Sequence, residues 1–411
     1  MNSGQKRQTP EVKTRRVFYI PGYDPIHPRR YRELYRKEGA AQADISGYEI
    51  ALKPKTGEGN YGWNVDAQID GAAVTSQVDV LVWSDIVRKS MSNSIPTTYW
   101  QLLCTAWTYI GSGVLWRLMR LRKGPVIAAL YPVGMLLLQA SLALMLWVGV
   151  YRLHGVAANH WAAQVLFGLA GAALAVSLLR WFKKKDNKFF AYYLMHDYAY
   201  SAQTGGANTP ELEVRMTRFA DDIAGALAQE VDEVLVVGHS SGAHLGVSVL
   251  ADLIRAGRVP TDGPALGFLT LGQVVPMVSF LPKAQRLRAD LAYLSTRDEL
   301  AWVDVTAPGD GCAFALCDPV AVSGVAPQGK RWPLVFSAAF TKTLSPERWK
   351  ALRWRFFRLH FQYLCAFDRP RDYDYFQITA GPQTLAARYA ERPASKSRID
   401  HAVSKFTSVA A

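Results

Sequence analysis

The residues most able to carry out chemistry are five consecutive ones, Gly238-His-Ser-Ser-Gly242, which form a G-x-S-x-G motif. They follow an apolar run at 231–237 and precede a run rich in Ala, Gly, Leu and Val. A serine on a sharp strand-to-helix turn projects its hydroxyl clear of the sheet, and small neighbours let other backbone approach. The N-terminus of the next helix adds amide donors for a developing oxyanion. This context predicts Ser240 as a nucleophile; a Gly-Ser turn without chemistry is the alternative.

The strand, the GHSSG turn and the helix after it resemble the α/β-hydrolase superfamily of lipases, esterases and related serine hydrolases. In element order the resemblance covers 16–83 and 190–380, and the turn is its one motif. It implies the chain order serine, acid, histidine, and an oxyanion hole made of two backbone N–H groups. Ser241 would supply one donor and Tyr23, in Pro21-Gly22-Tyr23, the other. A proline stands where the family commonly has histidine, which leaves the backbone donor unchanged.

A serine hydroxyl needs a general base, and the resemblance places that histidine after Ser240. His244 lies on the helix that follows the serine and cannot swing over it, while His401 lies in a polar segment at 395–404 that we expect to be mobile. His360 lies among aromatic residues, about 120 residues past the serine. We therefore predict His360 as the base, with a packed core or interface histidine as the alternative.

The acid must lie between the serine and the histidine, and four aspartates qualify: Asp298, Asp304, Asp310 and Asp318. Asp298 is expected to face solvent from a charged helical stretch at 288–300. Asp304 lies inside an apolar strand, where its side chain alternates away from the strand's end. Asp310 follows that strand in a Pro-Gly-Asp-Gly turn, where the superfamily has its catalytic acid. We predict Asp310, with Asp318 as the next candidate.

The surrounding elements must position these residues. Strands are expected at 16–20, 47–53, 62–69, 77–83, 231–237, 266–271 and 300–306, and helices at 28–44, 211–229 and 241–256. Residues 192–200 are expected to form a polar-aromatic link and 204–210 a loop. The alternation predicts an α/β fold of the α/β-hydrolase type, a mostly parallel sheet with helices on both faces. We divide the chain into 1–123, a transmembrane hairpin at 124–181, 182–394 with the catalytic residues, and a polar tail at 395–411.

The hairpin is predicted from two long segments without charge, 124–151 and 155–179. Each exceeds the roughly 20 apolar residues that span a bilayer, and three residues at 152–154 would connect them tightly. Eight basic residues flank the pair: Arg117, Arg120, Arg122, Lys123, Arg180, Lys183, Lys184 and Lys185. Only Arg152 lies in the turn, so the positive-inside rule predicts an integral protein of the inner or cytoplasmic membrane with its catalytic domain in the cytoplasm. A buried helical pair in a soluble protein is the alternative.

Residues 84–121 are rich in Trp and Tyr, so we expect an amphipathic helix at the bilayer surface or an ordinary core helix. The net charge of +13 fits an anionic membrane or a nucleic acid. Because much of this charge flanks the apolar segments and no basic stripe with interleaved aromatics occurs, no nucleic acid is expected. The N-terminal 16 residues are polar and predict no secretory signal peptide.

Four cysteines form no CxxC pair and no ligand cluster with histidine: Cys104, Cys312, Cys317 and Cys365. We expect free thiols in a reducing compartment, and no metal or organic cofactor. The predicted function is a membrane-anchored serine hydrolase that cleaves a lipid or other acyl ester through an acyl-enzyme. The alternatives are an acyltransferase with the same triad and a catalytically inactive membrane scaffold. The expected partners are this substrate and the bilayer, with no oligomeric state predicted.

Overall fold

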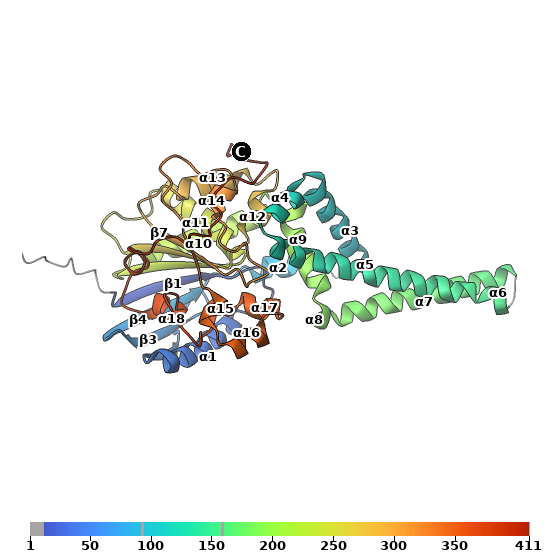
Figure 1. Ribbon diagram of the computed structural model, residues 1–411, viewed down its shortest axis with the longest axis horizontal. Coiled ribbons are helices and arrows are strands. Elements are labelled where there is room, and N and C mark those ends of the chain that lie inside the picture. Colours follow the sequence, from blue (N-terminus) through green and yellow to red (C-terminus); the bar gives the residue numbers. More distant parts are fainter. Residues whose placement is uncertain (1–11, 92–93, 158–159, 411) are drawn as a thin grey trace, which may run out of the picture.

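The computed structural model describes residues 12–91, 94–157 and 160–410. Residues 1–11 lie outside the described residues. They make up most of the polar N-terminal segment for which no signal peptide is predicted. The chain forms an α/β domain from which a pair of long helices projects (Figure 1).

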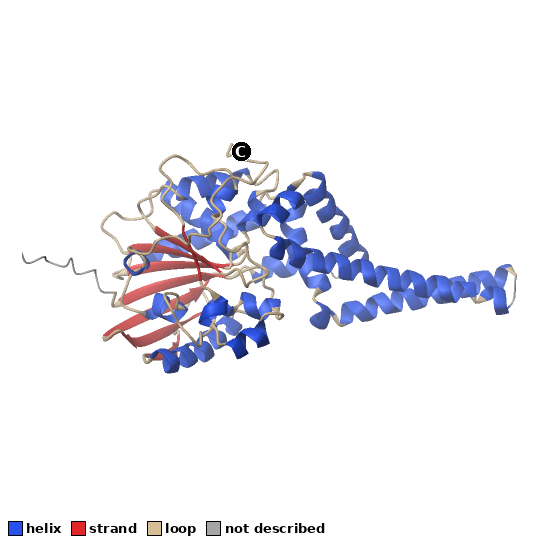
Figure 2. Cartoon of the chain, viewed as in Figure 1, coloured by secondary structure: helices blue, strands red, loops and turns tan. Residues whose placement is uncertain are grey.

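Within the described ranges, eight strands form one sheet in the order β2-β3-β4-β1-β5-β6-β7-β8. Figure 2 shows the strands in red with helices on both sides. β3 runs antiparallel to both β2 and β4, and the other neighbouring strands pair in parallel. The predicted α/β fold with a mostly parallel sheet is confirmed at this level. The strands are β1 (Thr14–Ile20), β2 (Glu49–Pro54), β3 (Gly62–Ile69), β4 (Ala72–Val80), β5 (Glu233–His239), β6 (Ala265–Leu271), β7 (Ala301–Thr306) and β8 (Leu334–Ser337).

Successive side chains of a strand point to opposite faces of the sheet, and each face here has its own core. Phe18 and Ile20 of β1 pack with α2, α10, α11 and α13, whereas Val17 and Tyr19 pack with α1, α15, α17 and α18. The first face carries α2 (Ser84–Ser90), α10 (Pro210–Leu227), α11 (Gly242–Arg255), α12 (Val275–Ser279), α13 (Gln285–Leu294) and α14 (Pro319–Val322). The second carries α1 (Arg29–Ser46), α15 (Phe340–Thr343), α16 (Pro346–Leu352), α17 (Phe356–His360), the 3₁₀ turn η2 (Gln362–Leu364), α18 (Tyr375–Ala380) and α19 (Leu385–Arg388).

The remaining helices form the projecting pair and its base. They are α3 (Ile95–Ala106), the π-helical turn η1 (Trp107–Gly111), α4 (Val114–Leu121), α5 (Lys123–Arg152), α6 (His154–Ala157), α7 (Trp161–Lys184), α8 (Asp186–Phe189) and α9 (Ala191–Gln203). α5 and α7 are long and apolar enough to cross a membrane, and only 17% and 11% of their most apolar windows are buried. At the base, Leu136 of α5 packs with Leu102 of α3 and Met195 of α9, so a separate core joins α5 to these two helices.

Several sequence predictions were wrong in detail. Residues 192–200 form most of helix α9 instead of a link, because Ala191, Tyr192, Met195 and Ala199 supply an apolar face that packs on α3 and α5. The second long helix begins at Trp161 instead of 155, since α6 lies between the two helices. The predicted helical stretch 84–121 divides into α2, α3, η1 and α4.

The strand predicted at 77–83 is displaced in the structure. β4 begins five residues earlier, at Ala72, and ends at Val80. Asp70 and Gly71 both have positive φ, 54° and 81°, which fits a tight hairpin turn that brings β4 back along β3. The C-terminal segment packs on the domain instead of being mobile: Ile399 bridges to Cys317, and the Val403 N–H donates to the Val322 carbonyl over 3.0 Å.

Candidate active site

Ser240 occupies the turn between β5 and α11 in a strained conformation. Its φ of 56° lies in the left-handed region, which residues with a Cβ seldom adopt. The glycines of the motif permit this turn: a Cβ on Gly242 would lie 2.0 Å from the Ile20 carbonyl oxygen, and one on Gly238 would lie 2.7 Å from the Gly242 carbonyl oxygen. The Ser240 N–H donates to the Leu271 carbonyl over 2.9 Å, which ties the turn to the end of β6. Such a turn is the geometry of a nucleophile elbow.

The structure brings the predicted base and acid together. Nδ1 of His360 lies 2.7 Å from Oδ2 of Asp310, and both side chains are buried. A carboxylate oxygen accepts, so Nδ1 of His360 is the donor, and in the tautomer with its single proton on Nδ1 the free lone pair lies on Nε2. That tautomer is the one a general base requires. His360 follows β8 and Asp310 follows β7, so 50 residues of chain separate the two.

Two further groups hold Asp310. The Tyr363 hydroxyl donates to Oδ2 over 3.1 Å, and the Cys312 N–H donates to Oδ1 over 2.9 Å. Burial raises the pKa of Tyr363 well above its usual value, and the Asp310 charge adds to this, so the phenol remains a donor. The same hydroxyl accepts from the Ala307 N–H over 2.9 Å. The carboxylate is therefore fixed in position by hydrogen bonds as well as by burial.

His239, the variable residue before Ser240 in the motif, contacts the backbone of His360. Its Nε2 lies 3.0 Å from the His360 carbonyl oxygen, and its Nδ1 lies 3.3 Å from the Tyr19 hydroxyl. A carbonyl oxygen only accepts, so Nε2 is the protonated nitrogen of His239 and Tyr19 donates to Nδ1. Burial lowers the pKa of His239 well below its usual value, with a smaller contribution from His360. His239 is thus a neutral donor that anchors the backbone of the predicted base.

The two predicted oxyanion donors lie on the other side of the serine. A Cβ on Gly22 would lie 3.0 Å from the Cβ and 3.4 Å from the Oγ of Ser240, so the backbone before Tyr23 runs directly against the Ser240 side chain. In the described part of the chain, the backbone N–H groups of Tyr23 and Ser241 have no hydrogen-bond acceptor. Both residues line the same cavity as Ser240. Two free donors beside a hydroxyl are what a tetrahedral oxyanion needs.

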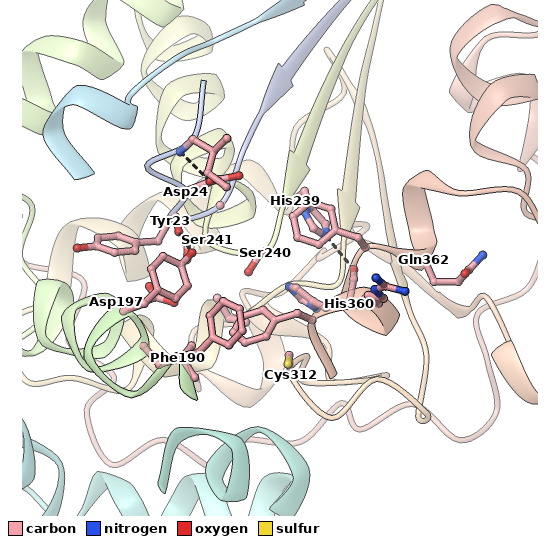
Figure 3. A pocket seen from close by; sticks show the side chains of 18 of the residues that line it. Tyr23, Asp24, Phe190, Asp197, His239, Ser240, Ser241, Cys312, His360 and Gln362 are labelled. Carbon is pink, nitrogen blue, oxygen red and sulfur yellow. Dashed lines mark hydrogen bonds between the residues drawn. The ribbon is translucent and has the colours of Figure 1, made fainter. Parts of the chain in front are cut away.

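Ser240 and His360 both line a cavity of about 1090 Å³. Figure 3 shows Ser240 between the Tyr23 and Ser241 side and the His360 ring. The described residues include no hydrogen bond between the serine hydroxyl and His360; such contacts commonly tighten only when substrate binds. Four acids of the described chain line this cavity, Asp24, Glu38, Asp186 and Asp197, and burial raises the pKa of Asp197, on α9, to about 7.

The other candidates considered from sequence lie elsewhere. Asp298 is exposed and pairs with Arg331, and Asp304 accepts from the Thr270 hydroxyl over 2.6 Å inside the core. Asp318 caps α14 and pairs with Lys330, and exposed His401 lies in the C-terminal segment. His244 is buried in α11, and burial lowers its pKa to about 4.

The sequence predicts no metal site, but three side chains in the structure lie close enough together to be considered as metal ligands. Ligand atoms of Asp310, Cys312 and His360 lie within 4.8 Å of one another. The His360 nitrogen and the Asp310 oxygens already face hydrogen-bond partners, however. Burial, together with the nearby Asp310 and Asp197 charges, raises the pKa of the Cys312 thiol well above its usual value. The donor set fits an imidazole–carboxylate pair better than a metal.

Comparisons with protein-family models, with curated proteins and with solved structures gave no match.

Sequence reasoning missed His239, Tyr363, Cys312 and Asp197. His239 stands at a position that the motif leaves variable, and the other three are marked by no motif. A signal was available for Tyr363, three residues beyond His360 in an aromatic run, but its contact with Asp310 depends on how the loops after β7 and β8 fold together.

Proposed function

We propose that this chain is a membrane-anchored serine hydrolase with an α/β-hydrolase-type fold, which cleaves an acyl ester through Ser240, His360 and Asp310. The observation that carries the proposal is the combination of a strained serine and an Asp-bound histidine in one cavity. A positive φ at a residue with a Cβ is uncommon, and such backbone strain is concentrated at functional sites. The chain order serine, acid, histidine also fits this fold type.

The proposed reaction has two steps. His360 Nε2 takes the Ser240 proton as Oγ attacks the ester carbonyl, and the Tyr23 and Ser241 N–H groups stabilise the oxyanion. The carbon–oxygen ester bond then breaks, the alkoxide leaves with the proton from His360, and an acyl-Ser240 ester remains. Water, deprotonated by His360, attacks that ester and releases the carboxylic acid and the free serine. Asp310 orients the ring and stabilises the imidazolium in both steps.

The membrane anchor is proposed from α5 and α7. Large apolar side chains are exposed around both helices, including Leu137, Leu144, Met145, Leu166 and Leu169. A helix pair that is apolar on every side and not buried by protein fits a bilayer better than water. The helix pair is inserted into the sequence of the α/β domain, and basic residues flank it on both sides. These flanks favour a hairpin whose two ends, together with the α/β domain, lie in the cytoplasm.

The test is labelling of the purified full-length protein by a fluorophosphonate probe. Wild type should be labelled, and Ser240→Ala should lose labelling and ester hydrolysis by several orders of magnitude. Ser201→Ala is the matched control, because Ser201 also lines the cavity and takes no part in the proposed reaction. Near-wild-type turnover in Ser240→Ala, or an unlabelled wild type in a folded preparation, would contradict the proposal.

A further inference from the structure

The cavity that holds Ser240 adjoins the base of the helix pair. Its lining includes Pro125 at the start of α5, Asp186 and Asn187 of α8, and Phe190 between α8 and α9. The same cavity is also lined by Arg355 and Phe357, which lie at the start of α17. Phe190 and Phe357 touch, with ring centroids 5.2 Å apart. The cavity is therefore built partly from the ends of the helices that we propose to cross the bilayer.

Exposed aromatic side chains lie on elements at this end of the domain. Trp354 is 72% exposed beside α17, and Trp100 and Trp107 of the α3–η1 segment are 65% and 80% exposed. α3, α8 and α17 all lie on the side of the domain from which α5 and α7 project (Figure 1). Trp favours the bilayer interface, and clustered exposed apolar groups mark binding surfaces. This face fits the headgroup layer of the same membrane that the helix pair enters.

The charges at the cavity are unequally paired. Among its acidic residues, Asp24 binds Arg30 over 3.0 Å, and Glu38 lies 3.6 Å from Arg348. Asp186 accepts from the N–H groups of Tyr192 and Tyr193. The fourth acid of the lining, Asp197, lies on α9, whereas Arg355 and Arg358 belong to the α16–α17 segment.

Three cations of the lining are exposed and form no ion pair with any residue in the described ranges: Lys37, Arg355 and Arg358. Among the described residues the lining holds five cations and four acids, of which Asp186 and Asp197 also form no ion pair, so it carries a small excess of positive charge. The two arginines lie within five residues of His360, on α17 or directly before it. Planar guanidinium groups bind phosphate and carboxylate oxygens in pairs of hydrogen bonds.

We propose that the site takes an amphiphilic acyl ester with an anionic, phosphate-type headgroup directly from the adjoining leaflet. Arg355 and Arg358 bind the headgroup, the apolar cavity wall takes the acyl chain, and the ester carbonyl reaches Ser240. The proposal rests on the proposed hydrolase function for turnover, but headgroup binding needs no catalysis and can be measured separately.

The binding test uses the full-length protein in mixed micelles with fluorescent, non-hydrolysable ether analogues of phosphatidylglycerol and phosphatidylcholine with identical chains. Wild type should bind the anionic analogue about tenfold more tightly, since a charge-assisted hydrogen bond contributes roughly a factor of ten or more. Arg355→Gln/Arg358→Gln should bind both analogues alike. Arg371→Gln is the matched control, an exposed arginine outside the cavity lining. Equal binding by wild type, or an unchanged preference in the double variant, overturns the proposal.

Two further arms separate the sources of failure. Soluble glycerol 3-phosphate at millimolar concentration should not displace the anionic analogue; displacement would identify a free anion as the ligand and overturn the membrane source. Hydrolysis of the matching phosphatidylglycerol ester should fall about tenfold in the double variant, while a soluble short-chain ester changes less than about twofold. A wild type that shows the binding preference but hydrolyses neither ester supports the headgroup site and contradicts only the hydrolase function.

Discussion

The hydroxyl of Tyr193 donates a hydrogen bond to the backbone carbonyl oxygen of Tyr23 over 2.6 Å. Tyr193 lies on α9, which follows the long helix α7 and the short helix α8, and Tyr23 carries a proposed oxyanion donor. The ring centroids of Tyr193 and Phe357 lie 6.2 Å apart, and Phe357 is three residues before His360. Helix α9, at the base of the helix pair, thus contacts both the backbone at Tyr23 and the helix that carries His360.

Tyr193→Phe should therefore weaken catalysis without removing any reacting group. We expect kcat to fall about three- to tenfold with KM little changed, because one net hydrogen bond contributes about 1 kcal/mol and here acts through the placement of the Tyr23 N–H. Steady-state kinetics and the rate of fluorophosphonate labelling should fall together. Tyr99→Phe is the control, since its hydroxyl also donates to a backbone carbonyl, that of Leu136, and it does not line the cavity. Equal effects of the two changes would assign Tyr193 a purely structural role.

Asp310→Asn tests the acid. The amide keeps the volume of the side chain but cannot stabilise the imidazolium and favours the wrong ring tautomer, so kcat should fall by about 10³- to 10⁴-fold. Asp298→Asn, the exposed acid of the same chain window, should stay within about twofold of wild type. If Asp318→Asn inactivates the protein while Asp310→Asn does not, the assignment of the acid is wrong.

His239 offers a test of positioning at a distance from the reacting atoms. His239→Leu removes the donor to the His360 carbonyl, and we expect kcat to fall about tenfold while the KM of a short ester is retained. His239→Gln keeps an N–H donor and should recover part of the rate. A Gln variant as poor as the Leu variant, with both folded by circular dichroism, would show that the hydrogen bond is not what matters.

The sequence predicted the parts of this site that depend on local chain geometry. The GHSSG turn lies between a buried strand and a helix because glycines at both ends of the motif allow the close backbone approach, and this could be inferred from five residues. Asp310 could be inferred from a turn just past a strand. The contact of its carboxylate with His360 was an expectation from chain order, and in the structure that contact exists.

What could not be predicted depends on chain segments that meet only in the folded domain. His239 binds a carbonyl 121 residues away, and Tyr363 reaches Asp310 across 53 residues. Helix α9 was missed because its aromatic and polar residues give a weak period until α3 and α5 are in place to bury one face. β8 has only four residues and is flanked by proline and small residues, so its sequence carries little strand signal.

The proposed membrane topology can be tested by cysteine accessibility in a cysteine-free background. Ala157→Cys, at the far end of the helix pair, should react with an impermeant reagent outside intact cells. Lys184→Cys, at the end of α7 next to the domain, should react only after lysis. The reason is that the basic flanks resist translocation while the single Arg152 does not. Release of the protein from membranes by carbonate, or the reverse labelling pattern, would contradict the topology.

Buried His244 predicts a specific dependence of stability on pH. Burial lowers its pKa to about 4 in the folded protein, against about 6.5 for an exposed histidine. Above pH 6.5 both states are neutral there and His244 has no effect. As the pH falls from 6.5 towards 4, the unfolded chain binds a proton that the folded chain does not, so the free energy of unfolding falls by about 3 kcal/mol in total.

His244→Leu removes this titration without leaving a polar group unpaired, since Nδ1 of His244 has no hydrogen-bond partner in the described structure. Urea unfolding in mild detergent at pH 7.5 and pH 4.5 should therefore show a smaller loss of stability for His244→Leu than for wild type. His401→Leu, at an exposed position, should lose as much stability as wild type does. If His244→Leu and wild type lose the same amount between the two pH values, the pKa of His244 is not lowered in the folded protein and the prediction is wrong.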